Sequence, residues 1–329
     1  MFQTLLSRVF ATPDSPTADL YFRNACADFI GSTVKQIAPT VFTSDTATLV
    51  IRHDLRAGRL PPTRRLIYLI DDDVDAGTED ASLPYLYRQK LKMVEGAAGR
   101  RIRRFAGVAV VASPVLARIF QPLMETHLLR PYWSEKFADL DHHSDCDWTD
   151  LAYLGSAAHR SDLQFILPVV RRLLVEHPGL RFNVGAEHRL PPDLDGHARV
   201  RRIPGRNWTE YRGELARRRF HIALYPLLDT PFNRGRSPNK LIEHAVVGAA
   251  PVYSESWREA RRASVHGAGL SVPNTVDAWH EAVGGLINDR TEMQRLATCA
   301  QRLGRSLNSS AQQRSLWRKL LEIREPLAA

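Results

Sequence analysis

Between residues 149 and 272, apolar runs of strand length alternate with stretches in which apolar residues recur at helical spacing. This alternation predicts a parallel β-sheet whose strands are connected by helices. Six strands are expected, at 151–155, 181–186, 199–204, 221–227, 250–254 and 270–273. An amphipathic helix is expected over 162–176, and the chain after residue 275 is predicted to be helical throughout.

The first 148 residues carry a weaker pattern of the same kind. Buried strands are expected at 48–53, 65–71 and 106–113, with helices at about 19–35, 83–100 and 114–126. The stretch 138–148 is polar and irregular, which favours a domain boundary there. We therefore predict an N-terminal α/β domain over 1–148, a C-terminal Rossmann-like domain over 149–310 and a last helix over 311–329.

Composition places the chain among ordinary globular proteins. Its 329 residues, 44% hydrophobic and 25% charged, suit two domains. No apolar run approaches the roughly 20 residues of a membrane span, and the N-terminus does not read as a signal peptide. Cys26, Cys146 and Cys299 lie too far apart for a metal knuckle or a disulfide framework. A reducing, cytoplasmic location is expected.

The net charge of +9 comes mainly from arginine, since only six of the 45 basic residues are lysine. Arginine suits phosphate recognition, so a phosphate-bearing partner is one explanation and a GC-rich genome is the other. No nucleic-acid partner is expected, because RNA-binding aromatics, a helix-turn-helix and zinc spacing are missing. The basic segments 100–105 and 317–323 predict a contact with an anionic membrane surface; solvated basic faces are the alternative.

The segment 221–254 predicts a strand, a loop, a helix and a second strand. Ser237 suits the helix N-cap, Pro238 the first helical position, and Gly248 the end of the helix. The loop follows the carboxyl end of its strand, which is where parallel sheets bind ligands. The helix N-terminus favours an anion, because its amide groups and dipole point there.

Charged residues of this segment predict which ligand binds. Arg234, Arg236 and Lys240 place positive charge near the helix N-terminus, where a diphosphate would lie. Glu243 follows Lys240 by three residues on the same helix face and can accept hydrogen bonds from ribose hydroxyls. The alternative is that Lys240 and Glu243 form only a surface ion pair.

A second loop, 155–162, connects the first strand of this domain to its helix. Gly155 and Ser156 allow close approach of the backbone, and His159 and Arg160 offer donors to phosphate or sugar. Ser161 or Asp162 can cap the helix. The loop lacks the dinucleotide-binding glycine spacing, and the chain has no P-loop motif. The alternative is a solvated loop without a ligand.

Two blocks, 151–186 and 225–254, resemble the donor-binding domain of GT-B glycosyltransferases of the group 1 type. The resemblance rests on the order of Pro231–Asn233, Ser237–Glu243 and Gly248–Val252. It implies an α/β protein with two Rossmann-like domains facing across a cleft, with the C-terminal helices packing back toward the N-terminal domain.

The resemblance also implies roles for individual residues. Glu243 would hold the ribose, Lys240, Ser237 and the loop from Asn233 to Arg236 the diphosphate or sugar, while Ser156 and His159 would line the pocket floor. Many relatives carry a glutamate eight positions before the second one, and here that position is Gly235. Either a neighbour such as Asn233 contacts the sugar or the sugar is held differently, and retention of configuration stays open.

The implied activity is transfer of a sugar from a nucleotide-diphosphate sugar to a glycan or lipid-linked acceptor, in bacterial surface polysaccharide synthesis. The sugar nucleotide is a co-substrate, and no bound cofactor is expected. Basic side chains and helix amides can stabilise the leaving group without a metal. If a general base is needed, Asp72, Asp73 and His53 are candidates, although the aspartates can also be a solvated turn. The alternative is a non-catalytic nucleotide-binding or assembly protein of the same fold.

Overall fold

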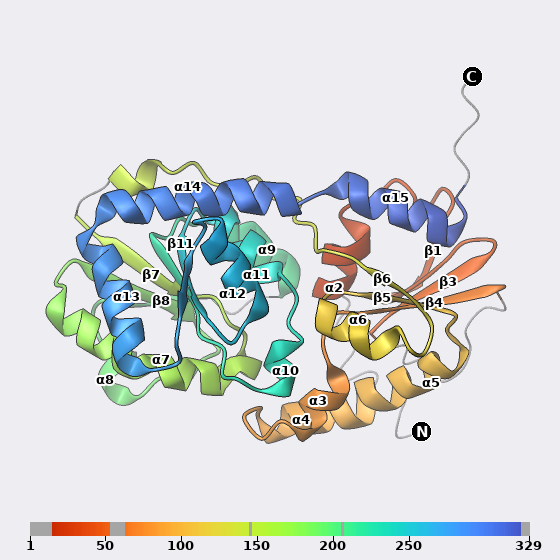
Figure 1. Ribbon diagram of the computed structural model, residues 1–329, viewed down its shortest axis with the longest axis horizontal. Coiled ribbons are helices and arrows are strands. Elements are labelled where there is room, and N and C mark those ends of the chain that lie inside the picture. Colours follow the sequence, from red (N-terminus) through yellow and green to blue (C-terminus); the bar gives the residue numbers. More distant parts are fainter. Residues whose placement is uncertain (1–14, 53–62, 145–146, 205–206, 324–329) are drawn as a thin grey trace.

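The computed structural model describes residues 15–52, 63–144, 147–204 and 207–323, which form two Rossmann-like domains (Figure 1). The N-terminal sheet has the strand order β1-β2-β3-β4-β5-β6. These strands are β1 (Lys35–Ala38), β2 (Val41–Thr43), β3 (Ala47–Ile51), β4 (Arg65–Ile70), β5 (Val108–Val111) and β6 (Glu125–Leu128).

Strands β3 to β6 run parallel, whereas β1, β2 and β3 pair antiparallel at one edge. The prediction of β3, β4 and β5 is confirmed, but the sequence pattern missed the other three strands. The helix expected over 19–35 ends by Arg23, and the one expected over 114–126 ends at Phe120 because β6 follows.

Helices cover both faces of the N-terminal sheet. Ile67 and Leu69 face the core formed with α2 (Pro16–Ala18) and the π-helical turn η1 (Asp19–Arg23), while Tyr68 and Ile70 face the opposite side. That alternation is the period of a β-strand buried on both faces. The opposite side is covered by α3 (Val74–Glu79), α4 (Tyr85–Lys90), η2 (Leu91–Gly96), α5 (Ala97–Phe105) and α6 (Pro114–Phe120).

The C-terminal sheet is entirely parallel, with the order β12-β11-β10-β7-β8-β9. All six strands predicted between 149 and 272 are confirmed. They are β7 (Thr149–Tyr153), β8 (Leu180–Gly185), β9 (Val200–Ile203), β10 (Ile222–Tyr225), β11 (Ala250–Ser254) and β12 (Leu270–Val272). The strand order reverses between β7 and β10, which creates a crevice at their carboxyl ends.

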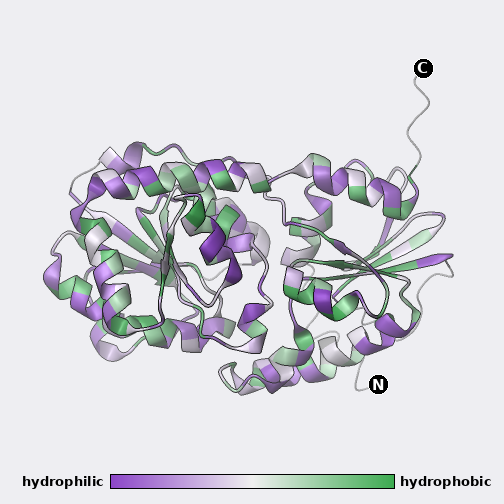
Figure 2. Ribbon diagram, viewed as in Figure 1, coloured by the Kyte–Doolittle hydropathy of each residue, from purple (hydrophilic) through white to green (hydrophobic). Residues whose placement is uncertain are grey.

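Helices surround the C-terminal sheet, and purple and green residues alternate along most of them (Figure 2). A short helix, η3 (Asp141–Ser144), precedes β7. The other helices are η4 (Ala157–His159), α7 (Arg160–Glu176), α8 (Pro192–Asp195), α9 (Trp208–Leu215), α10 (Pro231–Arg234), α11 (Asn239–Val246), α12 (Arg258–Val265), α13 (Val276–Asn288), α14 (Arg290–Leu307) and α15 (Ser310–Leu321).

The chain returns to the N-terminal domain at its end, as predicted. Figure 1 shows α14 along the C-terminal domain and α15 over the N-terminal one. Trp317 of α15 is fully buried and donates from Nε1 to the carbonyl of Tyr21 at 2.7 Å, and Gln313 donates to the carbonyl of Leu20 at 2.8 Å. The exact boundaries 1–148, 149–310 and 311–329 stay a prediction.

Contacts between the domains continue around the crevice. Phe232 of α10, in the C-terminal domain, is buried in the apolar core beside α3 of the N-terminal domain. Ser161 at the start of α7 donates from Oγ to the carbonyl of Ser82, between α3 and α4, at 2.6 Å. Within the described part of the chain, no helix is long and apolar enough to cross a membrane.

Candidate functional site

A cavity of about 860 Å³ lies between the two domains, at the carboxyl ends of β7 and β10 on one side and of β4 on the other. The C-terminal side of this cavity is the crevice at the strand-order reversal, where open α/β sheets bind ligands. Six of the predicted donor-binding residues line it together: Ser156, His159, Arg236, Ser237, Lys240 and Glu243. The two predicted loops and the helix that follows the second loop therefore meet at one site.

Glu243 is the most constrained carboxylate of the cavity. Its side chain lies in the second turn of α11, and the residue is 2% exposed. Oε1 accepts a hydrogen bond from the hydroxyl of Tyr211 at 2.6 Å, and Oε2 accepts from Lys240 Nζ at 2.5 Å. These donors compensate for the burial of a charged group.

Lys240 joins Glu243 to the loop after β7. Nζ also donates to the carbonyl of Leu154 at 2.6 Å. The ion pair between Lys240 and Glu243 therefore exists, but it lies in the wall of the cavity and not on the outer surface. Its position leaves the pair available to a bound ligand.

Arg236 connects the two domains. Nη1 donates to Asp72 Oδ1 at 2.6 Å, Nη2 donates to His159 Nε2 at 2.7 Å, and the guanidinium carbon lies 4.4 Å from the centroid of the Phe232 ring. Asp72 follows β4 of the N-terminal sheet, while Arg236 and His159 follow β10 and β7 of the C-terminal sheet. This buried ion pair therefore spans the cleft.

The charge state of this cluster follows from its neighbours. Burial acts to raise the pKa of Asp72, but Arg236 and Arg52 outweigh it and bring the pKa to about 2. Burial, followed by Arg236, lowers the pKa of His159. Because a guanidinium only donates hydrogen bonds, His159 Nε2 must accept, so the proton of the neutral ring lies on Nδ1.

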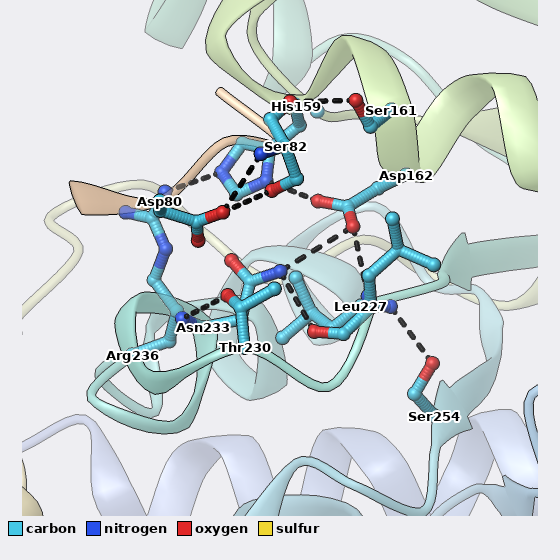
Figure 3. A network of polar contacts seen from close by, with 12 residues as sticks. Asp80, Ser82, His159, Ser161, Asp162, Leu227, Thr230, Asn233, Arg236 and Ser254 are labelled. Carbon is cyan, nitrogen blue, oxygen red and sulfur yellow. Dashed lines mark hydrogen bonds and ion pairs between the residues drawn. The ribbon is translucent and has the colours of Figure 1, made fainter. Parts of the chain in front are cut away.

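Asp162 lies beside His159 and fixes this arrangement (Figure 3). Oδ2 accepts from His159 Nδ1 at 2.7 Å, and Oδ1 accepts from the backbone amide of Leu228 at 2.8 Å and from Asn233 Nδ2 at 3.4 Å. Asp162 therefore joins the loop after β7 to the loop after β10. The expectation that Ser161 or Asp162 caps α7 is wrong, because α7 begins at Arg160 and already contains both residues. Their side chains bond to Ser82 and to His159 instead.

On the N-terminal side, Arg52 holds the two aspartates that line the cavity. Its Nη1 donates to Asp71 Oδ1 and to Asp72 Oδ2, each at 2.8 Å. Arg52 has φ = 59°, in the left-handed region that non-glycine residues rarely adopt. Such backbone conformations cost energy and concentrate at functional sites.

Several predicted site residues do not reach the cavity. Asn233 is buried and donates to Leu228 O at 2.9 Å, so it shapes the loop, and the suggested sugar contact stays a prediction. Arg234 pairs with Asp229 on the surface, and Arg160 is exposed at the start of α7. Asp73 caps α3, where its Oδ1 accepts from Ala76 N at 3.0 Å. His53 lies outside the described residues.

The predicted start of the central helix is shifted by one residue. Helix α11 begins at Asn239 with Pro238 as its N-cap, whereas Ser237 was expected to be the cap. Ser237 Oγ still accepts from the amide of Asn239 at 3.4 Å and lines the cavity. Gly248, with φ = 71°, follows the helix end as expected.

Aromatic residues of the cavity were missed from the sequence. Trp208 and Tyr211 lie one helical turn apart on α9 with their rings stacked, 6.0 Å between centroids, and Tyr21 lies opposite them in the N-terminal domain. Trp208 Nε1 donates to Asp19 Oδ2 at 2.9 Å across the domain interface. The available signal in the sequence was the spacing of Trp208 and Tyr211, three positions apart. Core packing explains such spacing equally well.

No family model matches the sequence, and a search of the curated proteins finds no match. Solved structures match in fold. Sucrose-phosphate synthase from Thermosynechococcus elongatus is 14% identical with a TM-score of 0.57, over 80% of this chain and 70% of that chain.

Two further matches agree. WaaG, a glycosyltransferase involved in lipopolysaccharide biosynthesis, is 13% identical with a TM-score of 0.58, over 79% of this chain and 78% of that one. HepE from Anabaena, solved with UDP and glucose, is 13% identical with a TM-score of 0.56, over 79% and 72%. The chain therefore has the GT-B fold of these glycosyltransferases.

Proposed function

We propose that this protein is a glycosyltransferase that binds a nucleotide-diphosphate sugar in the cavity and transfers the sugar to a glycan or lipid-linked acceptor. One observation carries the proposal: buried Glu243 and the half-buried side chains of Lys240 and Arg236 meet beside the N-terminus of α11, at the strand-order reversal inside a cleft between two domains. The C-terminal domain (149–310) binds the donor, and the N-terminal domain (1–148) binds the acceptor.

The donor is arranged along α11. Glu243, in the second turn of the helix, accepts hydrogen bonds from the ribose hydroxyls. Lys240, Arg236 and Ser237 at the amino end bind the diphosphate, where helix amides and dipole also favour negative charge. Ser156 and His159 form the floor beneath it. The nucleotide UDP, with which HepE was solved, is the first ligand to try.

The chemistry requires charge stabilisation more than a strong base. As the sugar bond breaks, negative charge develops on the departing diphosphate, and fixed cations and amides stabilise it. Those groups need no metal ion, so we propose a metal-independent reaction. Asp72 reaches the cavity from the acceptor side, but Arg236 and Arg52 make it a weak base while they hold it.

A second function shares this fold. A protein assigned as UDP-N-acetylglucosamine 2-epimerase from Listeria monocytogenes matches at 11% identity with a TM-score of 0.50, over 86% of this chain and 76% of that one. A non-catalytic nucleotide-binding protein of the same fold is the third possibility. The three possibilities differ in the fate of the donor. A transferase consumes it only with an acceptor, an epimerase converts it without one, and a binding protein leaves it unchanged.

Donor consumption with and without acceptor separates these possibilities. The purified protein is incubated with UDP-glucose, UDP-N-acetylglucosamine or GDP-mannose, with and without a bacterial glycolipid extract, and the nucleotides are followed by phosphorus NMR. A transferase releases nucleoside diphosphate only with the extract, and Glu243→Gln suppresses the release. Change of the donor without extract favours the epimerase and contradicts our proposal.

We further propose a cytoplasmic protein that rests on the inner membrane through the N-terminal domain. The surface of α4, η2 and α5 combines exposed apolar side chains with exposed basic ones. Leu86 is 79% and Phe105 is 72% exposed, and Lys92, Arg100 and Arg104 are exposed beside them along the same helical segment. Apolar and cationic groups on one helical surface favour an anionic bilayer over nucleic acid.

The second predicted membrane segment, 317–323, stays a prediction, but its packing makes it the weaker candidate. Trp317, Leu320 and Leu321 are fully buried against the N-terminal domain, so the apolar side of 317–323 is already used. The surface of α4 to α5 is therefore the segment to test.

Sedimentation with vesicles tests this contact. We expect the protein to bind vesicles that contain phosphatidylglycerol and not pure phosphatidylcholine, and Leu86→Ser with Phe105→Ser to abolish binding. Val175→Ser with Val265→Ser is the matched control, since these residues are 83% and 77% exposed on the C-terminal domain. Binding that is independent of anionic lipid, or lost equally in the control, contradicts the proposal.

A further inference from the structure

Both cationic side chains that line the cavity in the described part of the chain are paired with a carboxylate. Lys240 is paired with Glu243 on its own helix, but Arg236 is paired with Asp72 of the other domain. Arg236 therefore reaches away from its own loop, across the cleft, to a carboxylate of the acceptor side.

A carboxylate and a phosphate interact with an arginine side chain in the same way. Both present oxygens that accept from the guanidinium fork, and both carry the negative charge that compensates its burial. Asp72 Oδ1, 2.6 Å from Arg236 Nη1, already makes this interaction with the guanidinium. Arg236 Nε is buried and has no hydrogen-bond partner among the described residues, so one donor of the fork stays unsatisfied there.

We propose that Asp72 holds Arg236 in the place that the donor's diphosphate takes later, and that Arg236 exchanges Asp72 for a phosphate oxygen when the sugar nucleotide binds. The inference rests on the proposed function for the identity of the ligand. Asp72 is in this sense a positioning residue, because it acts through Arg236 and competes with the ligand for it.

His159 and Asp162 keep Arg236 within reach of both partners. His159 Nε2 accepts from Arg236 Nη2, and His159 Nδ1 is fixed by Asp162, whose other oxygen is fixed by the amide of Leu228. The imidazole therefore holds one guanidinium nitrogen on the donor side while the other one changes partner.

The exchange links the two substrates. When Arg236 turns to phosphate, Asp72 Oδ1 loses its donor, while Oδ2 stays bound to Arg52. The released oxygen lines the cavity on the acceptor side, where it can accept a hydrogen bond from an acceptor hydroxyl. Asp72 thus becomes available to the acceptor only after the donor has bound. This order disfavours binding of an acceptor to a site that does not yet hold a donor.

Calorimetric titration with UDP tests the exchange, because removing a competitor strengthens ligand binding. UDP binds only those molecules in which Arg236 is not paired with Asp72, so its apparent affinity is lowered in proportion to that fraction. Asp72→Asn is therefore expected to tighten UDP binding about tenfold. Arg236→Gln is expected to weaken it about tenfold, and in that background Asp72→Asn is expected to change it less than about twofold.

Asp19→Asn is the matched control. Asp19 also bonds across the interface, to Trp208 and Arg212, and its substitution changes the net charge by the same amount. If Asp72→Asn tightened binding merely by loosening the domains or by raising the positive charge, Asp19→Asn would do the same. We expect Asp19→Asn to leave the affinity for UDP within about twofold of the wild type.

Inorganic pyrophosphate is a second probe that separates this inference from the proposed function. If UDP binds no better than pyrophosphate, the nucleotide site is wrong, but tighter binding of pyrophosphate to Asp72→Asn still supports the exchange. If UDP binds well and Asp72→Asn binds it equally or more weakly, the exchange is overturned while the proposed function stands. Tightening that persists in Arg236→Gln also overturns it.

Hydrogen exchange on the wild type covers the case in which Asp72→Asn does not fold. UDP is expected to protect amides at the start of α11 and, at the same time, to increase exchange in the segment 72–74 of the N-terminal domain. Unchanged or increased protection of 72–74 on binding of UDP contradicts the exchange of partners.

Discussion

The hydroxyl of Tyr211 donates at 2.6 Å to Oε1 of Glu243, the carboxylate that the proposed function assigns to the ribose. Burial, followed by the nearby carboxylate, raises the pKa of Tyr211, so the phenol stays protonated and remains a donor. Tyr211 lies on α9, which follows β9, and reaches α11 from the side of the cavity. A ribose that bonds to Glu243 must therefore share or displace this hydroxyl.

Tyr211→Phe is expected to tighten binding of UDP about fivefold, because it leaves a buried carboxylate oxygen that only the ribose then satisfies. The same variant is expected to lose about 1–2 kcal/mol of stability without ligand. Calorimetry and urea unfolding measure both effects. Pyrophosphate, which has no ribose, is the control ligand and should bind unchanged; weaker binding of UDP would place the ribose elsewhere.

Asp162 is expected to be essential for the architecture of the site. Asp162→Ala leaves the amide of Leu228 and the Nδ1 proton of His159 without their buried acceptor, at a cost of about 3 kcal/mol in the free energy of unfolding. Urea unfolding measures the loss. Asp229→Ala, which removes the exposed partner of Arg234, should leave the unfolding midpoint unchanged. Equal effects of the two substitutions would show that the buried network contributes no more than a surface pair.

Three histidines form a cluster at the other end of the C-terminal sheet. The ring centroids of His142 and His143 lie 4.3 Å apart, and the ring of His221 lies 5.1 Å from that of His142. Burial lowers the pKa of His143 and of His221 from 6.5 to about 4. The unfolded chain therefore binds protons more readily than the native protein between these two values.

The free energy of unfolding is consequently expected to fall as the pH is lowered from 6.5 toward 4. A shift of that size is worth about 3 kcal/mol per histidine when it is complete. Urea unfolding at pH 7.5, 6 and 5 measures the decline. His143→Gln can still donate to the carbonyl of Gly248, which His143 Nε2 contacts at 2.9 Å, but it takes up no proton, so its decline should be shallower. An identical decline in this variant would exclude His143 as a cause.

Binding of the nucleotide is expected not to depend on a divalent cation, because Arg236, Lys240 and the amides of α11 supply the positive charge. The dissociation constant for UDP should agree within about twofold in EDTA and in magnesium chloride. Arg236→Gln in the same two buffers is the control. Because this variant lacks one of the two cations of the site, we expect magnesium to strengthen its binding of UDP. A wild type that binds UDP only with magnesium would contradict the metal-independent reaction.

Much of the C-terminal domain could be predicted because its strands are buried on both faces and stand as continuous apolar runs between helices. The strands missed in the N-terminal domain lack this property. Lys35–Ala38 and Glu125–Leu128 are half-buried edge strands with polar side chains, and Val41–Thr43 has only three residues. Their pairing depends on neighbouring strands and leaves little local pattern.

The site was predictable where its residues share one loop or helix. Ser237, Lys240 and Glu243 follow from the geometry of a single helix, whereas the contact of Arg236 with Asp72 joins residues 164 positions apart. Arg234 and Arg236 look equivalent in the sequence, yet one pairs with Asp229 on the surface and the other enters the cavity. Only the folded loop decides between them.

Titration of the wild type and Glu243→Gln with UDP, GDP, ADP and CMP tests the central claim most directly, because it asks whether this carboxylate recognises a nucleotide. We predict that one nucleoside diphosphate binds tightly and that Glu243→Gln weakens it about tenfold or more while pyrophosphate binds as before. Failure of all four nucleotides to bind the folded wild type, or equal binding to both proteins, would contradict the assignment of this cavity as the donor site.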